Sequence, residues 1–261
     1  MYDIIYEELS SEEAAAYLER MGYRGETRVT KECLDELIYL HQCNVPFECL
    51  DTYHTEWIPP LDKDSLFDKI VTRHRGGFCF ELNGLFVLLL RSLGFDAFSV
   101  GCRVAVNRTE LGNISHRATI VRLEGKEYIV DVGLGGPMAA FAVEISEKRQ
   151  TGHGETYWVE DAPGGWKLIC RLDENQQRYP TVLVAPIALI PRDFEAFCHY
   201  MLENPEIIFR TRRTVNRRTP NGHINITNNT LTVREGEEKV IRKFEEEELP
   251  EILSSYFRMK I

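Results

Sequence analysis

The chain has 261 residues, of which 43% are hydrophobic and 28% charged, and this composition excludes a disordered or fibrous protein. Asp and Glu outnumber Lys and Arg by 41 to 31, and the resulting net charge of −10 argues against a coat for nucleic acid or anionic membrane. The longest apolar runs, such as residues 85–90, are far too short to span a bilayer, so we expect neither nucleic acid nor membrane as a partner.

The first third of the chain is predicted to be mainly helical. A first helix starts after Ser10 and stops at Gly22, where glycine is typical of a helix C-terminus. Apolar residues then recur at helical spacing in residues 30–43, and a short helix is predicted at residues 64–71. An apolar helix follows over about residues 80–93.

Beyond Gly94 the hydrophobic pattern changes from helical to extended. Prolines at 186, 191 and 205 indicate a further change of module, with helices predicted at residues 193–202 and 245–257. The order of helices, strands and a mixed tail indicates an α+β fold. The strands are predicted at residues 97–106, 117–123, 127–132, 156–159, 166–171 and 181–185, and again within residues 207–244.

The seven cysteines show neither a CxxC pair nor the spacing of a zinc site, so we expect no metal. The N-terminal residues lack a basic start, an apolar stretch and a small-residue cleavage site, so we expect no secretory signal. Seven thiols without an export signal indicate a reducing compartment, and the predicted location is the cytoplasm. Most of these cysteines are expected to be small buried apolar residues.

Cys79 is the most informative of the seven. Gly76 and Gly77 precede it and the apolar helix follows it, which places its sulfur at or near a helix N-terminus. Free backbone N–H groups and the positive end of the helix dipole favour a thiolate there, and the same N–H groups can hold an oxyanion. A glycine pair before a helix is also a common structural turn.

A nucleophilic thiol needs a base and a residue that orients the base. His116 precedes the strand at residues 117–123, and Asp131 ends the returning strand. If Glu124 and Gly125 form the hairpin loop, His116 and Asp131 are diagonal neighbours on one face, within reach of a hydrogen bond. If the loop is Gly125 and Lys126, they share that face but lie one rung further apart.

Each of these two residues also has a plain structural interpretation. His116 alone fits a polar residue at a strand edge, and Asp131 alone fits a turn former at a strand end. An Asp within the apolar residues 129–132 requires a partner if it is buried, and His116 is the neighbour that the hairpin offers.

Taken together, these motifs resemble those of the arylamine N-acetyltransferases. Residues 75–83 resemble the nucleophile motif of that family, and residues 45–51 its substrate-pocket segment. His116 and residues 131–135 are similar to the other two motifs of its catalytic triad, and residues 204–222 to its C-terminal region. The resemblance covers about residues 10–260.

The resemblance implies an N-terminal helical bundle, a central β-barrel and a C-terminal α/β lid, around a papain-like cysteine-nucleophile core. It divides the chain into a helical domain at residues 1–95 with the nucleophile, a barrel domain at 96–203 with the His and the Asp, and a lid at 204–261. It also implies ping-pong acetyl transfer from acetyl-CoA to a small aromatic amine or hydrazine, as in the metabolism of foreign compounds. Acetyl-CoA is then a co-substrate, and no tightly bound cofactor is expected.

The resemblance assigns Cys79 as the nucleophile, His116 as the base and Asp131 as its orienting partner. Phe47 and Leu134 are the candidates for the acceptor pocket, although Phe47 also fits ordinary core packing. Leu134 stands where the family often has Phe, and Cys49 where it usually has Asn. For CoA, the resemblance implies contacts from Gly112 and Asn113 and from Thr214.

Two charged features remain. Five arginines lie within residues 210–218, and they fit either capture of the CoA phosphates or a solvated strand face with salt bridges. Glu48 and Arg75 flank two motifs, and we expect them to pair and brace the nucleophile loop.

Two other functions share part of this pattern. A papain-like hydrolase or a transglutaminase-like enzyme has the same Cys, His, Asp order, but the cysteine motif of papains is absent. An inactive binding module with an unreactive Cys79 is the other. Incubation with acetyl-CoA and an aryl amine, and separately with a peptide, distinguishes these functions from acetyl transfer.

Overall fold

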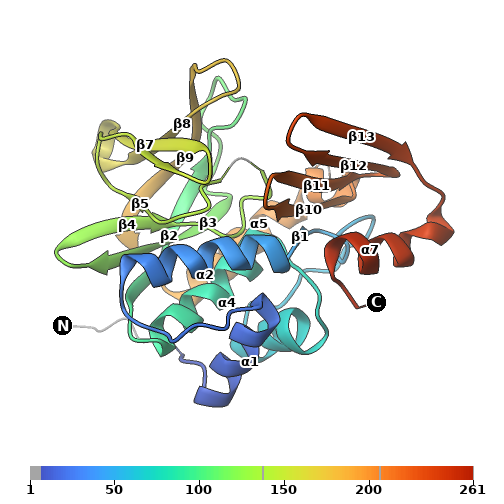
Figure 1. Ribbon diagram of the computed structural model, residues 1–261, viewed down its shortest axis with the longest axis horizontal. Coiled ribbons are helices and arrows are strands. Elements are labelled where there is room, and N and C mark those ends of the chain that lie inside the picture. Colours follow the sequence, from blue (N-terminus) through green and yellow to red (C-terminus); the bar gives the residue numbers. More distant parts are fainter. Residues whose placement is uncertain (1–6, 137, 206, 261) are drawn as a thin grey trace.

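The structure, a computed structural model, describes residues 7–136, 138–205 and 207–260. Helices from the first third of the chain pack beneath a strongly curved sheet, and a second, smaller sheet with one helix stands beside them (Figure 1). The predicted α+β class with a helical bundle, a barrel and an α/β lid is confirmed. Among the described residues, no helix has the length and apolarity needed to cross a membrane.

The helical bundle consists of α1 (Ser11–Met21), α2 (Lys31–Asn44), α3 (Lys63–Phe67), the π-helical turn η1 (Asp68–Thr72) and α4 (Cys79–Ser92). A capping box between Ser10 and Glu13 begins α1, and Gly22 ends it with a positive φ of 76°. Every residue of α4 from 79 to 90 is buried, so this apolar helix forms the centre of the bundle.

The larger sheet has eight antiparallel strands in the order β5-β4-β3-β2-β9-β8-β7-β6. The N–H of Val159 in β7 donates to the carbonyl of Ser146, just beyond β5, so the two ends of the sheet meet in a nearly closed barrel. The strands are β2 (Asp96–Val104), β3 (His116–Leu123), β4 (Lys126–Val130), β5 (Val143–Glu144), β6 (Gln150–Gly152), β7 (Glu155–Asp161), β8 (Lys167–Leu172) and β9 (Arg178–Ala188), with the short 3₁₀ turn η2 (Pro163–Gly165) before β8.

The β3–β4 hairpin has the first of the two predicted registers. Leu123 pairs with Lys126 across a two-residue loop of Glu124 and Gly125, whose φ angles of 52° and 76° are those of a type I′ turn. This turn matches the twist of the flanking strands, so the alternative loop of Gly125 and Lys126 is wrong.

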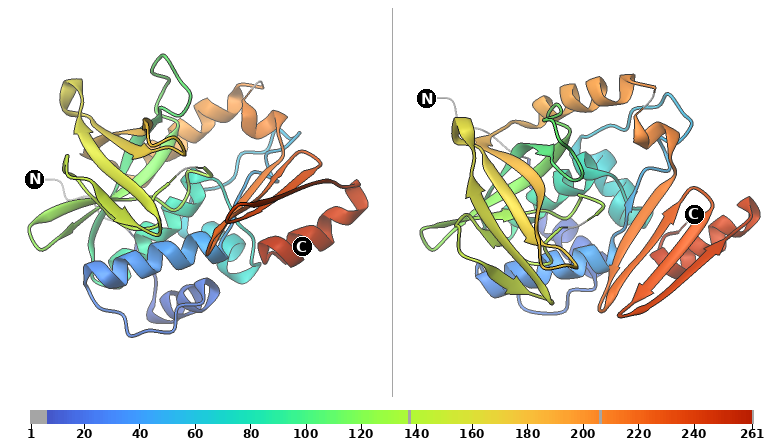
Figure 2. Two further views of the ribbon diagram at one scale, coloured as in Figure 1. Left: turned by 45° about the horizontal axis from the view of Figure 1, so that its top comes forward. Right: turned by 90° about the horizontal axis from the view of Figure 1, so that it is seen from above.

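The lid contains a five-stranded antiparallel sheet in the order β1-β10-β11-β12-β13. Its helix α7 covers one face through a small core that includes Val215, Ile226 and Leu253, and the other face is turned toward the barrel (Figure 2). The elements are β1 (Phe47–Glu48), α6 (Ile208–Thr211), β10 (Thr214–Thr219), β11 (Gly222–Thr227), β12 (Thr230–Glu235), β13 (Glu238–Lys243), η3 (Glu246–Glu248) and α7 (Leu249–Phe257). The helix α5 (Pro191–Glu203), which comes before the lid, packs against α4 through Phe194 and Phe80.

The short strands β5 and β6 were not predicted from the sequence, and two further details differ from the prediction. Residues 208–211 form the short helix α6, where only strands were expected, because the Ile207 carbonyl accepts hydrogen bonds from the N–H groups of Arg210 and Thr211. The two-residue strand β1 comes from the N-terminal third of the chain and pairs with β10 at the edge of the lid sheet.

Candidate active site

Cys79 is the first residue of α4 and is buried. The loop before it runs against β1, because the N–H of Glu48 donates to the carbonyl of Gly77 at 2.9 Å. A β-carbon at Gly76 would overlap the Pro46 carbonyl oxygen, so only glycine allows this approach. The predicted position of the sulfur at a helix N-terminus is confirmed, and the N–H groups of Cys79 and Phe80, the first two of the helix, have no acceptor within it.

His116 and Asp131 meet at the open end of the β3–β4 hairpin. His116 begins β3, Asp131 follows β4, and His116 Nε2 lies 2.6 Å from Asp131 Oδ2. The backbone of β3 brings His116 to Cys79, whose Sγ lies 3.7 Å from the carbonyl oxygen of Ser115. The structure therefore brings together all three residues that the sequence placed in the triad.

Asn83 fixes this arrangement and was not singled out by the sequence analysis. Its Nδ2 donates to the Arg117 carbonyl at 2.6 Å and to Asp131 Oδ1 at 3.0 Å, while its Oδ1 accepts from the N–H of Val132. One side chain on α4 thus holds both strands of the hairpin. The available signal was a polar residue four positions after Cys79, and therefore on the same face of the helix.

The electrostatics of the site favour a charged imidazole. Burial lowers the pKa of His116, but the charge and hydrogen bond of Asp131, followed by the hydrogen bond and charge of Cys79, outweigh burial and raise this pKa to about 10. Burial has the opposite effect on Asp131 and raises its pKa. The charge and hydrogen bond of His116, with donors from Asn83 and Gly133, outweigh burial and hold this pKa below its usual range. An imidazolium that is charged at neutral pH can stabilise a thiolate beside it.

Most of the other cysteines are held as neutral thiols. All seven are free and buried. Burial raises the pKa of Cys49 to about 11 and that of Cys170 to about 12, and it also raises the pKa values of Cys43, Cys102 and Cys198. Cys49, which stands where the family that the sequence resembles usually has Asn, follows β1 and donates from Sγ to the Arg212 carbonyl.

A network of five charged residues, three of them buried, braces the nucleophile loop. The predicted pair is confirmed, with Arg75 Nη2 2.7 Å from Glu48 Oε1. Lys69, from η1, was not predicted as part of it, yet its Nζ lies 2.7 Å from Glu81 and 2.9 Å from Asp51. Glu81 in turn accepts the N–H of Phe78 at 3.0 Å, so the network reaches the residue before Cys79.

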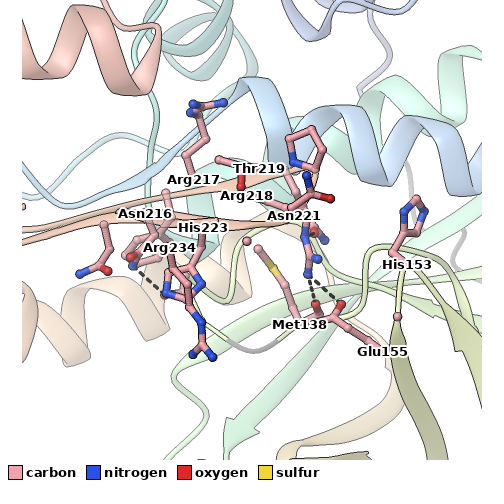
Figure 3. A pocket seen from close by; sticks show the side chains of 18 of the residues that line it. Met138, His153, Glu155, Asn216, Arg217, Arg218, Thr219, Asn221, His223 and Arg234 are labelled. Carbon is pink, nitrogen blue, oxygen red and sulfur yellow. Dashed lines mark hydrogen bonds and ion pairs between the residues drawn. The ribbon is translucent and has the colours of Figure 1, made fainter. Parts of the chain in front are cut away.

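The two residues predicted for the acceptor pocket line different spaces. Phe47 lines a cleft of about 930 Å³ between the barrel and the lid, which also borders Val132 and Gly135 (Figure 3). Leu134 lines a cavity of only about 20 Å³ inside the barrel, together with Asp131.

The residues predicted for CoA lie in the loop before β3 and at the start of β10. The Gly112 carbonyl accepts a hydrogen bond from Arg103, and Asn113 Nδ2 lies 3.2 Å from the Tyr200 hydroxyl on α5. Thr214 begins β10, where its N–H donates to Cys49 Sγ at 3.3 Å.

Protein contacts occupy four of the five arginines in residues 210–218. Arg210 donates to carbonyls of Leu202, Thr55 and Glu56, and Arg213 pairs with Glu246. Arg217 donates to the Cys43 and Tyr256 carbonyls, and Arg218 to Gln42, Met138 and Glu155. These contacts favour a strand face with salt bridges over phosphate capture for four of the five arginines. Arg212 is exposed, and its side chain makes no such contact in the described residues.

The described residues contain no group of three or more His, Cys, Asp or Glu that could hold a metal ion. The site instead consists of a thiol, an imidazole, a carboxylate and backbone N–H groups. This set suits nucleophilic acyl transfer, in which the thiol forms a bond to the acyl carbon and the imidazole moves a proton.

Comparison with known proteins gives a consistent result. The family model described as N-acetyltransferase matches residues 30–261. A protein of Salmonella typhimurium named arylamine N-acetyltransferase / N-hydroxyarylamine O-acetyltransferase is 36% identical over 165 residues, 62% of this chain and 58% of that protein. The arylamine N-acetyltransferase of Mycobacterium tuberculosis is 30% identical over 255 residues, 94% of this chain and 89% of that protein. The solved structure of arylamine N-acetyltransferase from Salmonella typhimurium has a TM-score of 0.90 and 26% identity, and the match covers 96% of this chain and 92% of that one.

Proposed function

This chain belongs to the arylamine N-acetyltransferase family and is an acyltransferase, and we propose that it carries the acetyl group of acetyl-CoA to aromatic amines and hydrazines through an acetyl-cysteine at Cys79. The observation that carries the proposal is the placement of His116 between two partners. Its Nε2 binds Asp131 at 2.6 Å, and its charge is supported by Cys79 at the start of a helix.

In the first half-reaction the Cys79 thiolate attacks the carbonyl carbon of the thioester. The N–H groups at the start of α4 stabilise the oxyanion that forms. Collapse of this intermediate breaks the bond to the CoA sulfur, and His116 gives that sulfur its proton, so CoA leaves as a thiol. Acetyl-Cys79 and a neutral imidazole remain.

In the second half-reaction the acceptor nitrogen attacks acetyl-Cys79. Aromatic amines are neutral at pH 7, so their lone pair is available. His116 accepts the proton that the nitrogen loses, and the Cys79 sulfur leaves as a thiolate. The enzyme returns to its starting pair of thiolate and imidazolium.

Asp131 acts by holding the imidazole in the required tautomer and by stabilising its positive charge. Phe47 forms an aromatic wall for the acceptor on the cleft side of the site. Gly112, Asn113 and Thr214 are the proposed contacts of CoA, which binds as a co-substrate and leaves each cycle.

Intact mass spectrometry after incubation with acetyl-CoA alone tests the proposal. We expect one acetyl group on the wild-type protein, mapped to Cys79, and its removal on addition of an aromatic amine. Cys79→Ser should carry no thioester, whereas the control Cys170→Ser, which changes a thiol of raised pKa, should acetylate normally. An acetyl group on another cysteine, or none at all, would refute the mechanism.

A further inference from the structure

We propose that two copies of this chain form a dimer in which β13 of one copy pairs antiparallel with β13 of the other. The contact is made by residues 237–243, and it joins the two lid sheets into one continuous sheet.

β13 forms a free edge of the lid sheet, because the strand order of that sheet ends with it (Figure 1). All six of its residues are exposed, and Val240 and Ile241 are each 61% exposed. An edge strand presents unpaired backbone N–H and C=O groups, which can extend the ladder into another chain. At the opposite edge, the N–H of Glu48 in β1 donates to the Gly77 carbonyl, so that edge is covered. Pairing through one edge gives a closed, twofold dimer and not an open chain of copies.

The backbone of β13 limits the registers that such a pair can adopt. In an antiparallel sheet, the N–H and C=O groups of successive residues point alternately toward one neighbouring strand and the other. The N–H of Phe244, directly after β13, donates to the carbonyl of Asn229, directly before β12, so even-numbered residues of β13 point these groups inward. Lys239, Ile241 and Lys243 therefore point theirs outward. In a dimer, odd-numbered residues must then face odd-numbered residues of the second copy, and even-numbered residues must face even-numbered ones.

One of these registers pairs opposite charges throughout. When Val240 faces Val240 of the second copy, Glu238 faces Arg242 and Glu237 faces Lys243. The twofold symmetry of the dimer forms each of these ion pairs twice. Opposite charges directly across two strands stabilise the pair.

The neighbouring registers bring like charges together. A shift of two residues in one direction places Lys239 opposite Lys243 of the second copy, and a shift in the other direction places Lys239 opposite its own equivalent. Like charges directly opposite each other are destabilising. The charge pattern of β13 is thus complementary to itself in the register centred on Val240.

The strand next to β13 within the chain does not provide these opposite charges. On β12, Glu235 lies opposite Glu238, and Arg234 lies opposite Lys239, so both cross-strand pairs are alike in charge. A second copy supplies the cation that β12 does not place opposite Glu238.

The closest side-chain contacts of the dimer lie at its centre. Even-numbered residues form the pairs without mutual hydrogen bonds, in which the Cα atoms are about 4.5 Å apart. The two Val240 side chains therefore cover each other, with an ion pair of Glu238 and Arg242 on either side. Arg242 also lies 3.1 Å from Glu248, but these side chains are 51% and 41% exposed, and a guanidinium has five N–H donors to share.

Sedimentation velocity of the full chain over a range of protein concentrations measures the dimer. Glu238→Lys and Arg242→Glu each turn both ion pairs into like-charge pairs, so each variant alone should raise the dissociation constant about tenfold or more. An equal mixture of the two variants restores opposite charges in both pairs, and we expect it to form a heterodimer with the dissociation constant of the wild type. The matched control Glu147→Lys makes the same charge change at an exposed turn of the barrel and should leave the dissociation constant unchanged.

Val240→Lys provides a second test, which decides if either charge variant does not fold. It places two lysines opposite each other at the twofold axis and should also raise the dissociation constant about tenfold or more. Its control is Ile187→Lys, since Ile187 is an aliphatic residue of β9 that is 66% exposed. A wild type that stays monomeric at every concentration overturns the proposal. Variants of β13 that dimerise as tightly as the wild type overturn it too, and so does a mixture that stays monomeric.

Discussion

Lys69→Met should strongly destabilise the protein, although the residues around Lys69 in the sequence do not indicate such a role. The Lys69 side chain is 5% exposed and faces Glu81 at 2.7 Å, Asp51 at 2.9 Å and Glu48 at 4.0 Å. At an effective dielectric constant of about 20, the first contact alone is an attraction of about 6 kcal/mol, which offsets the cost of burying the ions. Removing the lysine leaves buried carboxylates without that partner, so we expect a loss of about 3–5 kcal/mol in the free energy of unfolding.

Chemical denaturation of the wild type and of Lys69→Met measures this loss. The matched control is Lys63→Met, because Lys63 and its partner Glu13 are 22% and 24% exposed and their pair should contribute only about 0–1 kcal/mol. Burial already raises the pKa of Glu81, and the charge of Lys69 is the main effect that lowers it. The variant therefore raises this pKa further, and its defect should be smaller at pH 5 than at pH 8, because a raised carboxyl pKa costs stability as pH increases through it.

The double variant Lys69→Met/Glu81→Gln separates charge from packing. Glutamine at position 81 keeps an acceptor for the N–H of Phe78 but carries no charge, so we expect it to recover stability in the Lys69→Met background. A loss similar to that of the control, or a defect of equal size at both pH values, would show that the network does not act through charge.

Three further predictions concern the site. Asp131→Asn should reduce single-turnover acetylation of Cys79 on the order of 10³–10⁴-fold with near-native far-UV circular dichroism, because the imidazole tautomer is lost; wild-type rates would remove the carboxylate from the mechanism. Leu134→Phe should cost about 1–3 kcal/mol in denaturation experiments by overfilling the cavity of about 20 Å³, and an unchanged midpoint would contradict this packing. Because the pKa of His116 is raised to about 10, its contribution to stability is complete below about pH 6.5 and is lost as pH rises through 10. The advantage of wild type over His116→Gln should thus be smaller at pH 9.5 than at pH 6, and an advantage that grows with pH would refute the assignment.

The catalytic geometry could be predicted because it depends on local rules. Glycine at position 125 permits the type I′ turn, and that turn fixes which residues of the hairpin face one another. His116 and Asp131 then share an end of one face without any knowledge of the barrel. Cys79 follows the same logic, since a glycine pair and an apolar run predict a helix start.

The supporting residues could not be predicted because their partners are distant in the sequence. Lys69 lies on a π-helical turn, which rotates side chains away from the α-helical pattern and directs this one inward. Asn83 contacts β3 and the segment after β4, and nothing in its own neighbourhood indicates either contact. The same holds for the arginines of residues 210–218, whose partners come from several elements.

The division into domains at residues 1–95, 96–203 and 204–261 stays a prediction. One strand of the lid sheet comes from the first of these segments, since β1 pairs with β10. Pairing of this kind gives no sequence signal, because two residues are too few to show a strand period.

The segment after β4 serves two parts of the site at once. Asp131 orients His116, while Gly135, four residues later, lines the cleft under Phe47. Gln42 joins these parts, because its Nε2 donates to the Asp131 carbonyl and its Oε1 accepts from Arg218. The pair of His116 and Asp131 thus belongs to the barrel side of this link, and Arg218 belongs to the lid. Since Gln42 joins the two, we expect a substitution at Arg218 that keeps Gln42 in place to leave the contact between His116 and Asp131 intact.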